Sequence, residues 1–142
     1  MTLDELKIQV ANDLKVNDER LDTESLKNQE LYSKYLEIKS NFELLMYKAK
    51  GDYKILYRDK CEYYGGKADA KIYETKPFDL KVLKSDLSVY IESDEDIIKM
   101  ENKIVYLETV VKYVDCVLKS ISARGWDIKN AIQWKNFEAG LM

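Results

Sequence analysis

The sequence predicts a mainly α-helical fold built from long helices, with a short irregular or β-like segment in the middle of the chain. Its 142 residues include only five glycines and one proline, so few positions favour turns. Charged residues make up 35% of the chain, a share typical of long, surface-rich helices. Two stretches also carry apolar residues at close to heptad spacing. The length fits one domain, and no repeat or flexible linker divides it, so we treat residues 1–142 as a single domain.

The first predicted element is a short amphipathic helix over residues 2–14. Thr2 can cap its N-terminus, because Glu5 follows three residues later and completes a capping box. Such a short helix needs a surface to dock on. Its apolar stripe consists of Leu3, Leu6, Val10 and Leu14.

A much longer helix is predicted to start between Asp22 and Ser25 and to run to Tyr64, where Gly65 and Gly66 end it. About 40 helical residues span roughly 60 Å, which is too long for a compact core in a chain of this size. We therefore expect an elongated protomer in which this helix packs against another helix or another subunit. The apolar positions are Leu31, Tyr35, Ile38, Phe42, Leu45, Ala49, Leu56 and Tyr63.

Residues 65–93 have an irregular pattern and are predicted to connect the helices of residues 1–64 to those of residues 94–142. Residues 71–75 read as a short strand before the single proline, residues 79–85 as one or two helical turns, and residues 88–92 as another extended piece.

A second long helix is predicted to begin at Ser93 or Asp94, because this polar cap is followed by two acids that favour the positive end of the helix dipole. The helix is expected to stop near Arg124 and Gly125. Its apolar seam consists of Ile97, Met100, Ile104, Leu107, Val111, Val114 and Leu118.

Residues 127–139 are predicted to form a separate terminal helix. Aromatic residues this dense at a terminus often anchor it to a partner surface. The candidate oligomerisation residues are Trp126, Ile128, Ile132, Trp134 and Phe137.

Composition argues against several kinds of catalytic site. Without histidine, the chain lacks an imidazole base and any His-bearing zinc site, so we expect no enzyme, no metal and no cofactor. Acids at 92 and 94–96 lack the spacing of a calcium loop and suit a helix start better. Cys61 and Cys116 match no metal or redox motif, so they read as free thiols. With no signal peptide and no long apolar run, a cytosolic location is expected.

Residues 47–73 stand out because they hold seven cations and four acids, for a local charge of +3, whereas the rest of the chain totals −6. Lys50, Lys54 and Arg58 recur every four residues and so repel one another along one helical face. Six tyrosines are interleaved with these cations. Such a mixture suits single-stranded nucleic acid, whose bases stack on rings while its phosphates meet cations.

One other interpretation of the same window remains open. A Lys/Glu-rich helical face is usually just solvated, and tyrosines at heptad spacing are usually part of a core. Under that interpretation the protein is a helical scaffold that binds only protein partners. The Gly65-Gly66-Lys67 sequence is not a nucleotide-binding P-loop, because it lacks the upstream glycine and the Ser/Thr after the lysine.

Three blocks of the sequence together resemble the UvsY family of phage recombination mediators. The first runs from Arg58 to Lys67, with the order basic, acidic, basic, apolar, acidic, two tyrosines, two glycines and a final basic residue. The second is Ser122–Lys129, followed by residues 137–140. The third, Leu31–Leu36, is similar to the start of that family's long helix. The likeness therefore spans most of the chain after about residue 30.

This resemblance implies a mainly helical protein that assembles into an open ring or barrel of six or seven copies. It also implies binding of single-stranded DNA and loading of a RecA-like recombinase onto DNA covered by single-stranded-DNA-binding protein. These are the steps of homologous recombination, repair and recombination-dependent replication. A phage-encoded member would act in the host cytoplasm, without membrane contact.

The family's DNA-contacting basic pair corresponds to Arg58 and Lys60, with Lys67 at the basic position after the glycines. Asp59 stands between the two cations and partly cancels their field. The resemblance also makes the C-terminal helix the assembly element. The full set of candidate DNA-binding residues is Arg58, Lys60, Lys67, Lys54, Tyr63 and Tyr64.

Overall fold

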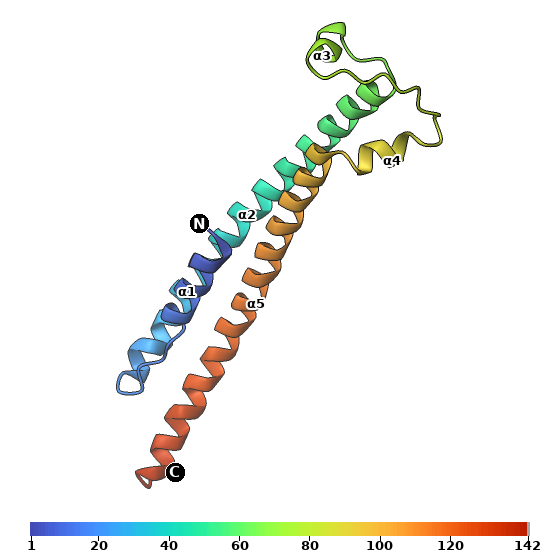
Figure 1. Ribbon diagram of the computed structural model, residues 1–142. Coiled ribbons are helices and arrows are strands. Elements are labelled where there is room, and N and C mark those ends of the chain that lie inside the picture. Colours follow the sequence, from blue (N-terminus) through green and yellow to red (C-terminus); the bar gives the residue numbers. More distant parts are fainter. Residues whose placement is uncertain (142) are drawn as a thin grey trace. The chain divides into compact units, whose positions relative to one another are not determined.

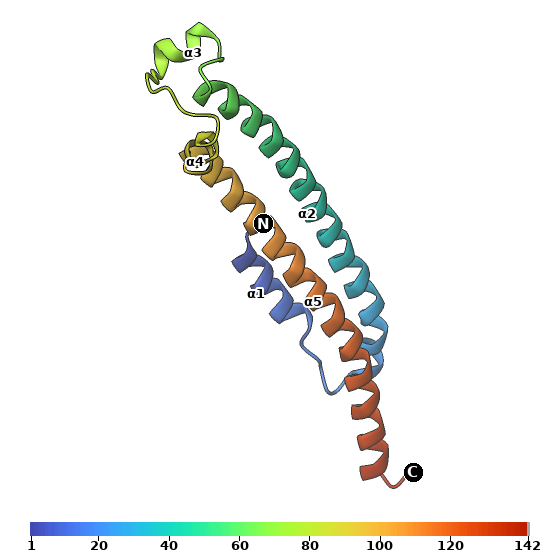
Figure 2. The same cartoon turned by 90° about the vertical axis from the view of Figure 1, so that its right-hand side faces the viewer.

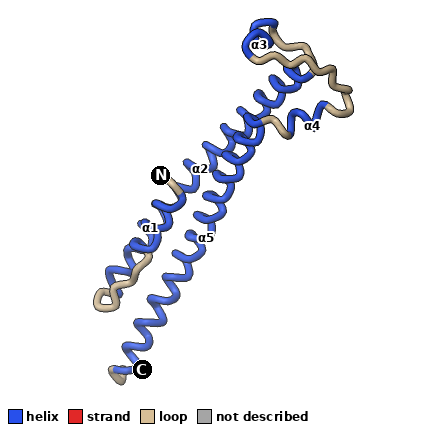
Figure 3. The backbone as a smooth tube through the Cα atoms, viewed as in Figure 1, coloured by secondary structure: helices blue, strands red, loops and turns tan. Residues whose placement is uncertain are grey.

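The computed structural model describes residues 1–141, which contain five helices and no strand (Figures 1 and 3). The expected all-helical class is confirmed. In order along the chain, the helices are α1 (Leu3–Asp13), α2 (Leu21–Tyr64), α3 (Ala70–Thr75), α4 (Leu87–Glu92) and α5 (Glu95–Glu138).

The chain forms two compact units. The first contains Met1–Glu43 and the chain from Thr109 onwards, and the second contains Leu44–Glu108. Both long helices, each of 44 residues, contribute to both units. Within each unit α2 and α5 run antiparallel. Residues nearer the C-terminus of α2 contact residues nearer the N-terminus of α5.

Helix α1 begins as the sequence predicts. The backbone N–H of Glu5 donates to Oγ1 of Thr2, and the backbone N–H of Thr2 donates to a carboxylate oxygen of Glu5, which completes the capping box. Leu6 is fully buried, and Leu3, Val10 and Leu14 pack around it at the edge of the core. The predicted apolar stripe is therefore the docking face of α1.

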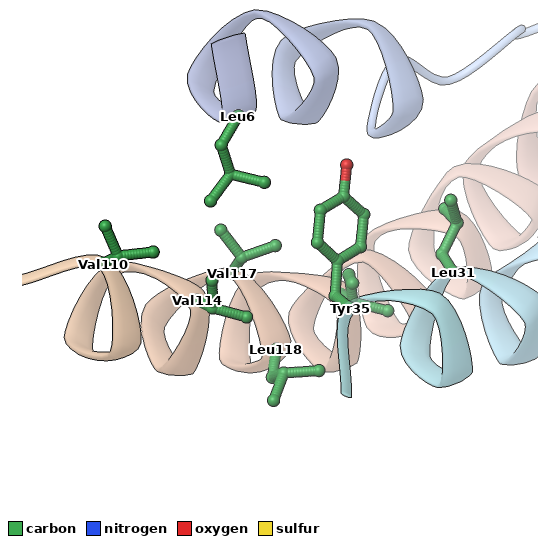
Figure 4. Close-up of a cluster of buried hydrophobic side chains, with 8 residues drawn as sticks. Leu6, Leu31, Tyr35, Val110, Val114, Val117 and Leu118 are labelled. Carbon is green, nitrogen blue, oxygen red and sulfur yellow. The ribbon is translucent and has the colours of Figure 1, made fainter. Parts of the chain in front are cut away.

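The core of the first unit lies where α1 covers α2 and α5 (Figure 4). Leu6 points from α1 towards Val117 and Tyr35, so three helices meet at this point. The hydroxyl of Tyr35 donates to the carboxylate of Asp13 at 2.7 Å, which satisfies the ring's one polar group at the edge of the core. The buried cluster comprises Leu6, Leu31, Tyr35, Val110, Val114, Val117, Leu118 and Ile121.

A buried arginine on α5 ties the connection between α1 and α2 to the core. Arg124 is only 4% exposed, and its guanidinium ion-pairs with Glu24. It also donates to the backbone oxygens of Leu14 and Lys15 and to the side chain of Asn28, with distances of 2.9–3.2 Å. A guanidinium can supply these donors at once because they lie in one rigid plane.

The predicted helix end at Arg124 and Gly125 is wrong, because α5 continues without a break to Glu138. A separate terminal helix over residues 127–139 is therefore wrong as well. The glycine serves packing instead: a Cβ at Gly125 would lie 3.3 Å from Nδ2 of Asn28, which donates to the backbone oxygen of Ile121 at 2.7 Å. Gly125 thus lets α2 approach α5 closely.

Helix α2 begins at Leu21, within a few residues of the predicted start, and ends at Tyr64 as predicted. Gly66 has φ of +76°, and the N–H of Lys67 donates to the backbone oxygen of Glu62 at 2.8 Å. These are features of a Schellman C-cap, in which glycine takes the left-handed conformation without a Cβ penalty.

The middle segment differs from the sequence prediction, since α3 and α4 form where extended pieces were expected (Figure 2). Residues 71–75 and 88–92 are helical, and the helical turns expected at 79–85 are absent. A strand requires a neighbouring strand to satisfy its backbone, and residues 1–141 offer none. Short helices satisfy those groups locally, and Ile91 of α4 is buried in the second unit.

We expect Arg124→Met to lower the free energy of unfolding by about 3–5 kcal/mol, because the buried Glu24 would lose its partner charge. Urea denaturation followed by far-UV circular dichroism, at equal protein concentration, measures this. Arg20→Met is the control, since Arg20 pairs with Asp22 at the exposed surface and its loss should change stability little. Similar stabilities of the two variants would contradict the role given to Arg124.

Candidate nucleic-acid interface

Lys60 lies in the second unit, where the last turns of α2 pack against the start of α5. Its ammonium is 2.8 Å from a carboxylate oxygen of Asp96 and 3.2 Å from one of Asp94. The side chain is 15% exposed. Burial lowers the pKa of Lys60, but the two carboxylates raise it by more, so the net shift is upwards and the group stays charged. Lys60 therefore joins α2 to α5 through two ion pairs.

Asp94 is the centre of this arrangement. One of its carboxylate oxygens accepts hydrogen bonds from the backbone N–H groups of Asp96 and Ile97. Asp94 is therefore the N-cap of α5, and it is one of the two positions at which the sequence predicts this helix to begin. The other oxygen accepts the hydroxyl of Tyr64 at 2.6 Å. Burial raises the pKa of Asp94, but the hydrogen bonds from Tyr64, Ile97 and Lys60 lower it by more, to a net value below its usual range.

The tyrosines at the end of α2 take part in an aromatic cluster. Tyr63 stacks on Tyr73 of α3 with ring centroids 5.4 Å apart, and Tyr64 meets Phe78 edge-on at 4.9 Å. The hydroxyl of Tyr73 donates to the backbone oxygen of Tyr63 at 2.6 Å. Tyr90 of α4 completes the cluster. Both candidate stacking rings, Tyr63 and Tyr64, are thus half-buried and hold the middle segment on α2.

A cavity of about 610 Å³ opens beside this cluster. Its walls come from the end of α2, from α3 and from the start of α5, all within the second unit. Lys60 and Lys76 contribute positive charge, and Tyr63 and Ile72 contribute apolar surface. Acidic residues also line the cavity, at Asp59 and at residues 94–96, and two of them pair with Lys60.

The other candidate cations lie at the surface. Arg58 is exposed and has only a long contact of 3.4 Å with its neighbour Asp59. Lys54 and Lys67 are exposed and form no ion pair within residues 1–141. Lys50, one helical turn before Lys54, pairs with Glu108 of α5 at 3.5 Å. The sequence-predicted row of cations is therefore only partly neutralised by the fold.

The candidate oligomerisation residues lie in the first unit and separate into two groups. Ile128 is buried and belongs to the interior of its own chain. Trp126, Trp134 and Phe137 are each more than 60% exposed, and the rings of Trp134 and Phe137 stack at 5.5 Å beside a shallow cavity of about 320 Å³. Ile132 is 38% exposed. Exposed stacked aromatics of this size are typical of interaction surfaces.

Several residues of this region were not singled out from the sequence. The sequence predicts Asp96 only as a first-turn acid, although it pairs with Lys60. The sequence does not predict that one aromatic cluster contains Tyr73, Phe78 and Tyr90. No short-range spacing connects these residues to the end of α2. The single available signal was that aromatic residues recur through an otherwise polar connector.

Neither a metal-binding group nor a membrane-spanning helix is found in the part of the chain that the structure describes. No three His, Cys, Asp or Glu side chains of residues 1–141 are placed to hold a metal ion. No helix in this range has a stretch long and apolar enough to cross a bilayer.

The fold defines a class of all-helical proteins in which two long helices pair, and here exposed cations and half-buried tyrosines lie on and just after α2. Residues 9–141 match the family described as "Recombination, repair and ssDNA binding protein UvsY". The chain is 25% identical, over 99% of both sequences, to the "Recombination protein uvsY" of Enterobacteria phage T4. This chain therefore belongs to the UvsY family, which confirms the resemblance seen in the sequence.

Solved structures agree with this assignment. The fold is similar to a crystal structure of the bacteriophage T4 recombination mediator protein UvsY with a TM-score of 0.85, at 25% identity and with 98% of each chain covered. A second crystal form of that protein matches with a TM-score of 0.84, covering 97% of this chain. The overall fold of this chain is thus similar to one that is known experimentally.

Replacing Asp94 by alanine should lower the free energy of unfolding by about 2 kcal/mol at neutral pH, because α5 loses its cap and Lys60 one of its two partners. The lowered pKa of Asp94 also has a pH consequence. Its stabilisation is complete above the unfolded-state pKa, near 3.8, and is lost as the pH falls through the lower folded-state value.

Urea titrations at pH 7 and pH 3 measure both effects. Wild-type protein should lose more stability between these pH values than Asp94→Ala does. Asp79→Ala is the control, since Asp79 is an exposed carboxylate of the same unit. An Asp94→Ala profile parallel to that of the wild type would contradict the assignment.

Proposed function

We propose that this chain is a single-stranded-DNA-binding recombination mediator. It would help to load a RecA-like recombinase onto DNA covered by single-stranded-DNA-binding protein, in recombination, repair and recombination-dependent replication. Membership of the UvsY family supports this proposal. The structural observation that carries it is the group of exposed cations on and just after α2, in a chain whose net charge is −3.

The proposed DNA contacts are Arg58, Lys54 and Lys67 at the surface, together with Lys60. The first three can meet phosphates without giving up a strong partner. Lys60 can turn towards a phosphate only by leaving Asp96, the exposed partner, while Asp94 remains within its reach. Tyr63 and Tyr64 line the same cavity as Lys60 and are the proposed stacking rings.

We further propose that the protein acts as a ring of six or seven copies assembled through its C-terminal helix. The exposed rings of Trp126, Trp134 and Phe137 support this role, with Ile132 beside them and Ile128 supporting the helix from inside the chain. Such a ring repeats a weak DNA site many times, so later contacts become intramolecular and the overall affinity rises. A strand held in this way would be less available to the competing DNA-binding protein and would be presented to the recombinase.

The double variant Arg58→Ala with Lys60→Ala should bind oligo-dT more weakly. The slope of log affinity against log salt should also become shallower by about 1.4, since each phosphate contact on a single strand contributes about 0.7. Fluorescence anisotropy over a salt series measures both quantities. The matched control is Lys99→Ala with Lys103→Ala, two exposed lysines on α5 in the same unit.

Two outcomes would count against this proposal. If well-assembled wild-type protein fails to bind oligo-dT even at low salt, the protein is better explained as a scaffold that binds only other proteins. If the Arg58/Lys60 variant loses assembly together with binding, these two residues are not the DNA site.

Replacing Trp134 and Phe137 together by alanine should lower the mass of the assembly, because these rings are exposed in the isolated chain and would be covered in a ring. Sedimentation velocity measures the mass. Glu138→Ala, an exposed change on the same helix, should leave the mass unchanged. DNA affinity should fall with the loss of assembly. An unchanged mass in the double variant would place the interface elsewhere.

A further inference from the structure

Gly51 lies inside α2 at a point where this chain gives no reason for a glycine. No atom lies within 4 Å of the position that a Cβ would occupy, and the residue is exposed. By contrast, Gly65 and Gly66 end α2, Gly140 has φ of +72° just after α5, and Gly125 faces Asn28. A glycine inside a helix costs about 1 kcal/mol relative to alanine. The missing side chain at Gly51 is thus best explained by something outside the chain that approaches the backbone.

Gly51 is the centre of an exposed strip on α2 within the second unit. We define the α2 strip as the residues that share its face at helical spacings of three and four. Its apolar members are well exposed, at 68% for Leu44, 63% for Tyr47 and 53% for Ile55. The α2 strip comprises Leu44, Tyr47, Gly51, Ile55 and Arg58.

Tyr47 is the only tyrosine of residues 47–73 that is exposed. The other five tyrosines of this range are half-buried, including Tyr63 and Tyr64 in the aromatic cluster. The ammonium of Lys50, which also pairs with Glu108, lies over one face of the Tyr47 ring, 6.0 Å from its centre. An open ring beside cations is the arrangement that binds single-stranded nucleic acid by stacking and by phosphate contacts.

Charge favours a nucleic acid over the start of α5 from a second copy as the occupant of the α2 strip. Residues 44–58 carry four cations and a single acid, Asp52, which is half-buried. A helix from another copy would need a matching acidic face. Along residues 95–108 of α5, however, three of the four acids already contact side chains of α2, and only Glu95 is left exposed without such a contact. The three contacts pair Asp96 with Lys60, Glu101 with Tyr53 and Glu108 with Lys50.

We propose that single-stranded DNA runs along the α2 strip, with a base stacked on Tyr47 and the strand passing close to the helix backbone at Gly51 before its phosphates reach Arg58. This inference rests on the proposed function, and it extends the site by about three helical turns from the cations assigned through the family resemblance. Lys48 and Lys54 flank the path and are exposed.

The first test uses two variants at exposed positions of α2. Gly51→Leu places a bulky side chain on the path but replaces glycine by a better helix former, so weaker binding cannot be attributed to unfolding. Tyr47→Ala removes the stacking ring. Each variant should reduce affinity for oligo-dT by about fivefold or more, the size expected for one stacked base. Asn41→Leu and Tyr32→Ala, exposed positions of α2 in the first unit, should bind as the wild type does.

The second test locates the bases directly. Photocrosslinking of an iodouracil-substituted oligonucleotide, followed by trypsin digestion and mass spectrometry, should label residues 40–48, the tryptic peptide that contains Tyr47. Labelling confined to residues 61–67, the peptide of Tyr63 and Tyr64, would overturn the proposal.

The remaining outcomes separate this inference from the proposed function. If the wild type binds oligo-dT and both α2-strip variants bind equally well, the path is wrong while the function stands. If neither the wild type nor the variants bind, the proposed function itself fails. If Gly51→Leu changes the sedimenting mass, the α2 strip is a protein interface, and the proposal is overturned in favour of a second copy.

Discussion

The packing of α2 against α5 is the contact on which each unit depends. A long amphipathic helix gains most of its stability from burying one face, and neither helix has another partner of comparable length in the described chain. In the first unit Tyr35 and Leu31 meet the buried valines and leucine of α5, and α1 covers the join. In the second unit Ala49 of α2 and Ile97 of α5 are fully buried. The apolar seams explain why the helices pair, but they leave the register open, because similar residues recur along both.

Polar groups fix the register within each unit. Arg124 can satisfy its donors only when the start of α2 and the residues that directly follow α1 lie opposite its own turn of α5. Asp94 has the same effect in the second unit, because it caps α5 and also accepts from Tyr64 and Lys60 of α2. Buried ionic groups contribute little net stability compared with apolar replacements, but they penalise every alternative arrangement that leaves them unpaired. Both long helices therefore have a single defined register.

The same polar contacts shape the surface available to DNA. Lys60, Tyr63 and Tyr64 contribute to the fold at the end of α2, so their interaction with a ligand competes with contacts inside the chain. Arg58, Lys54 and Lys48 have no such strong partner and face solvent along α2, on the stretch that begins at Tyr47. A cation that is already neutralised adds less to the attraction of a polyanion than one that is free. The proposed path along the α2 strip therefore uses cations that the fold leaves less neutralised than Lys60.

The sequence by itself determined the helical class, the caps and the apolar faces, because these depend on local spacing. Thr2 with Glu5, Asp94 before two acids, and Gly65 with Gly66 were each read from neighbours in the chain, as was the basic character of residues 47–73. Only the tertiary structure decided the course of α5 past Gly125, because the reason for that glycine is Asn28, almost a hundred residues earlier. The tertiary structure alone also decided which tyrosines remain exposed to solvent, since Tyr63 and Tyr64 are covered by α3, α4 and their connections. Helical spacing tells which residues share a face, whereas the partner of that face is set by contacts between distant segments.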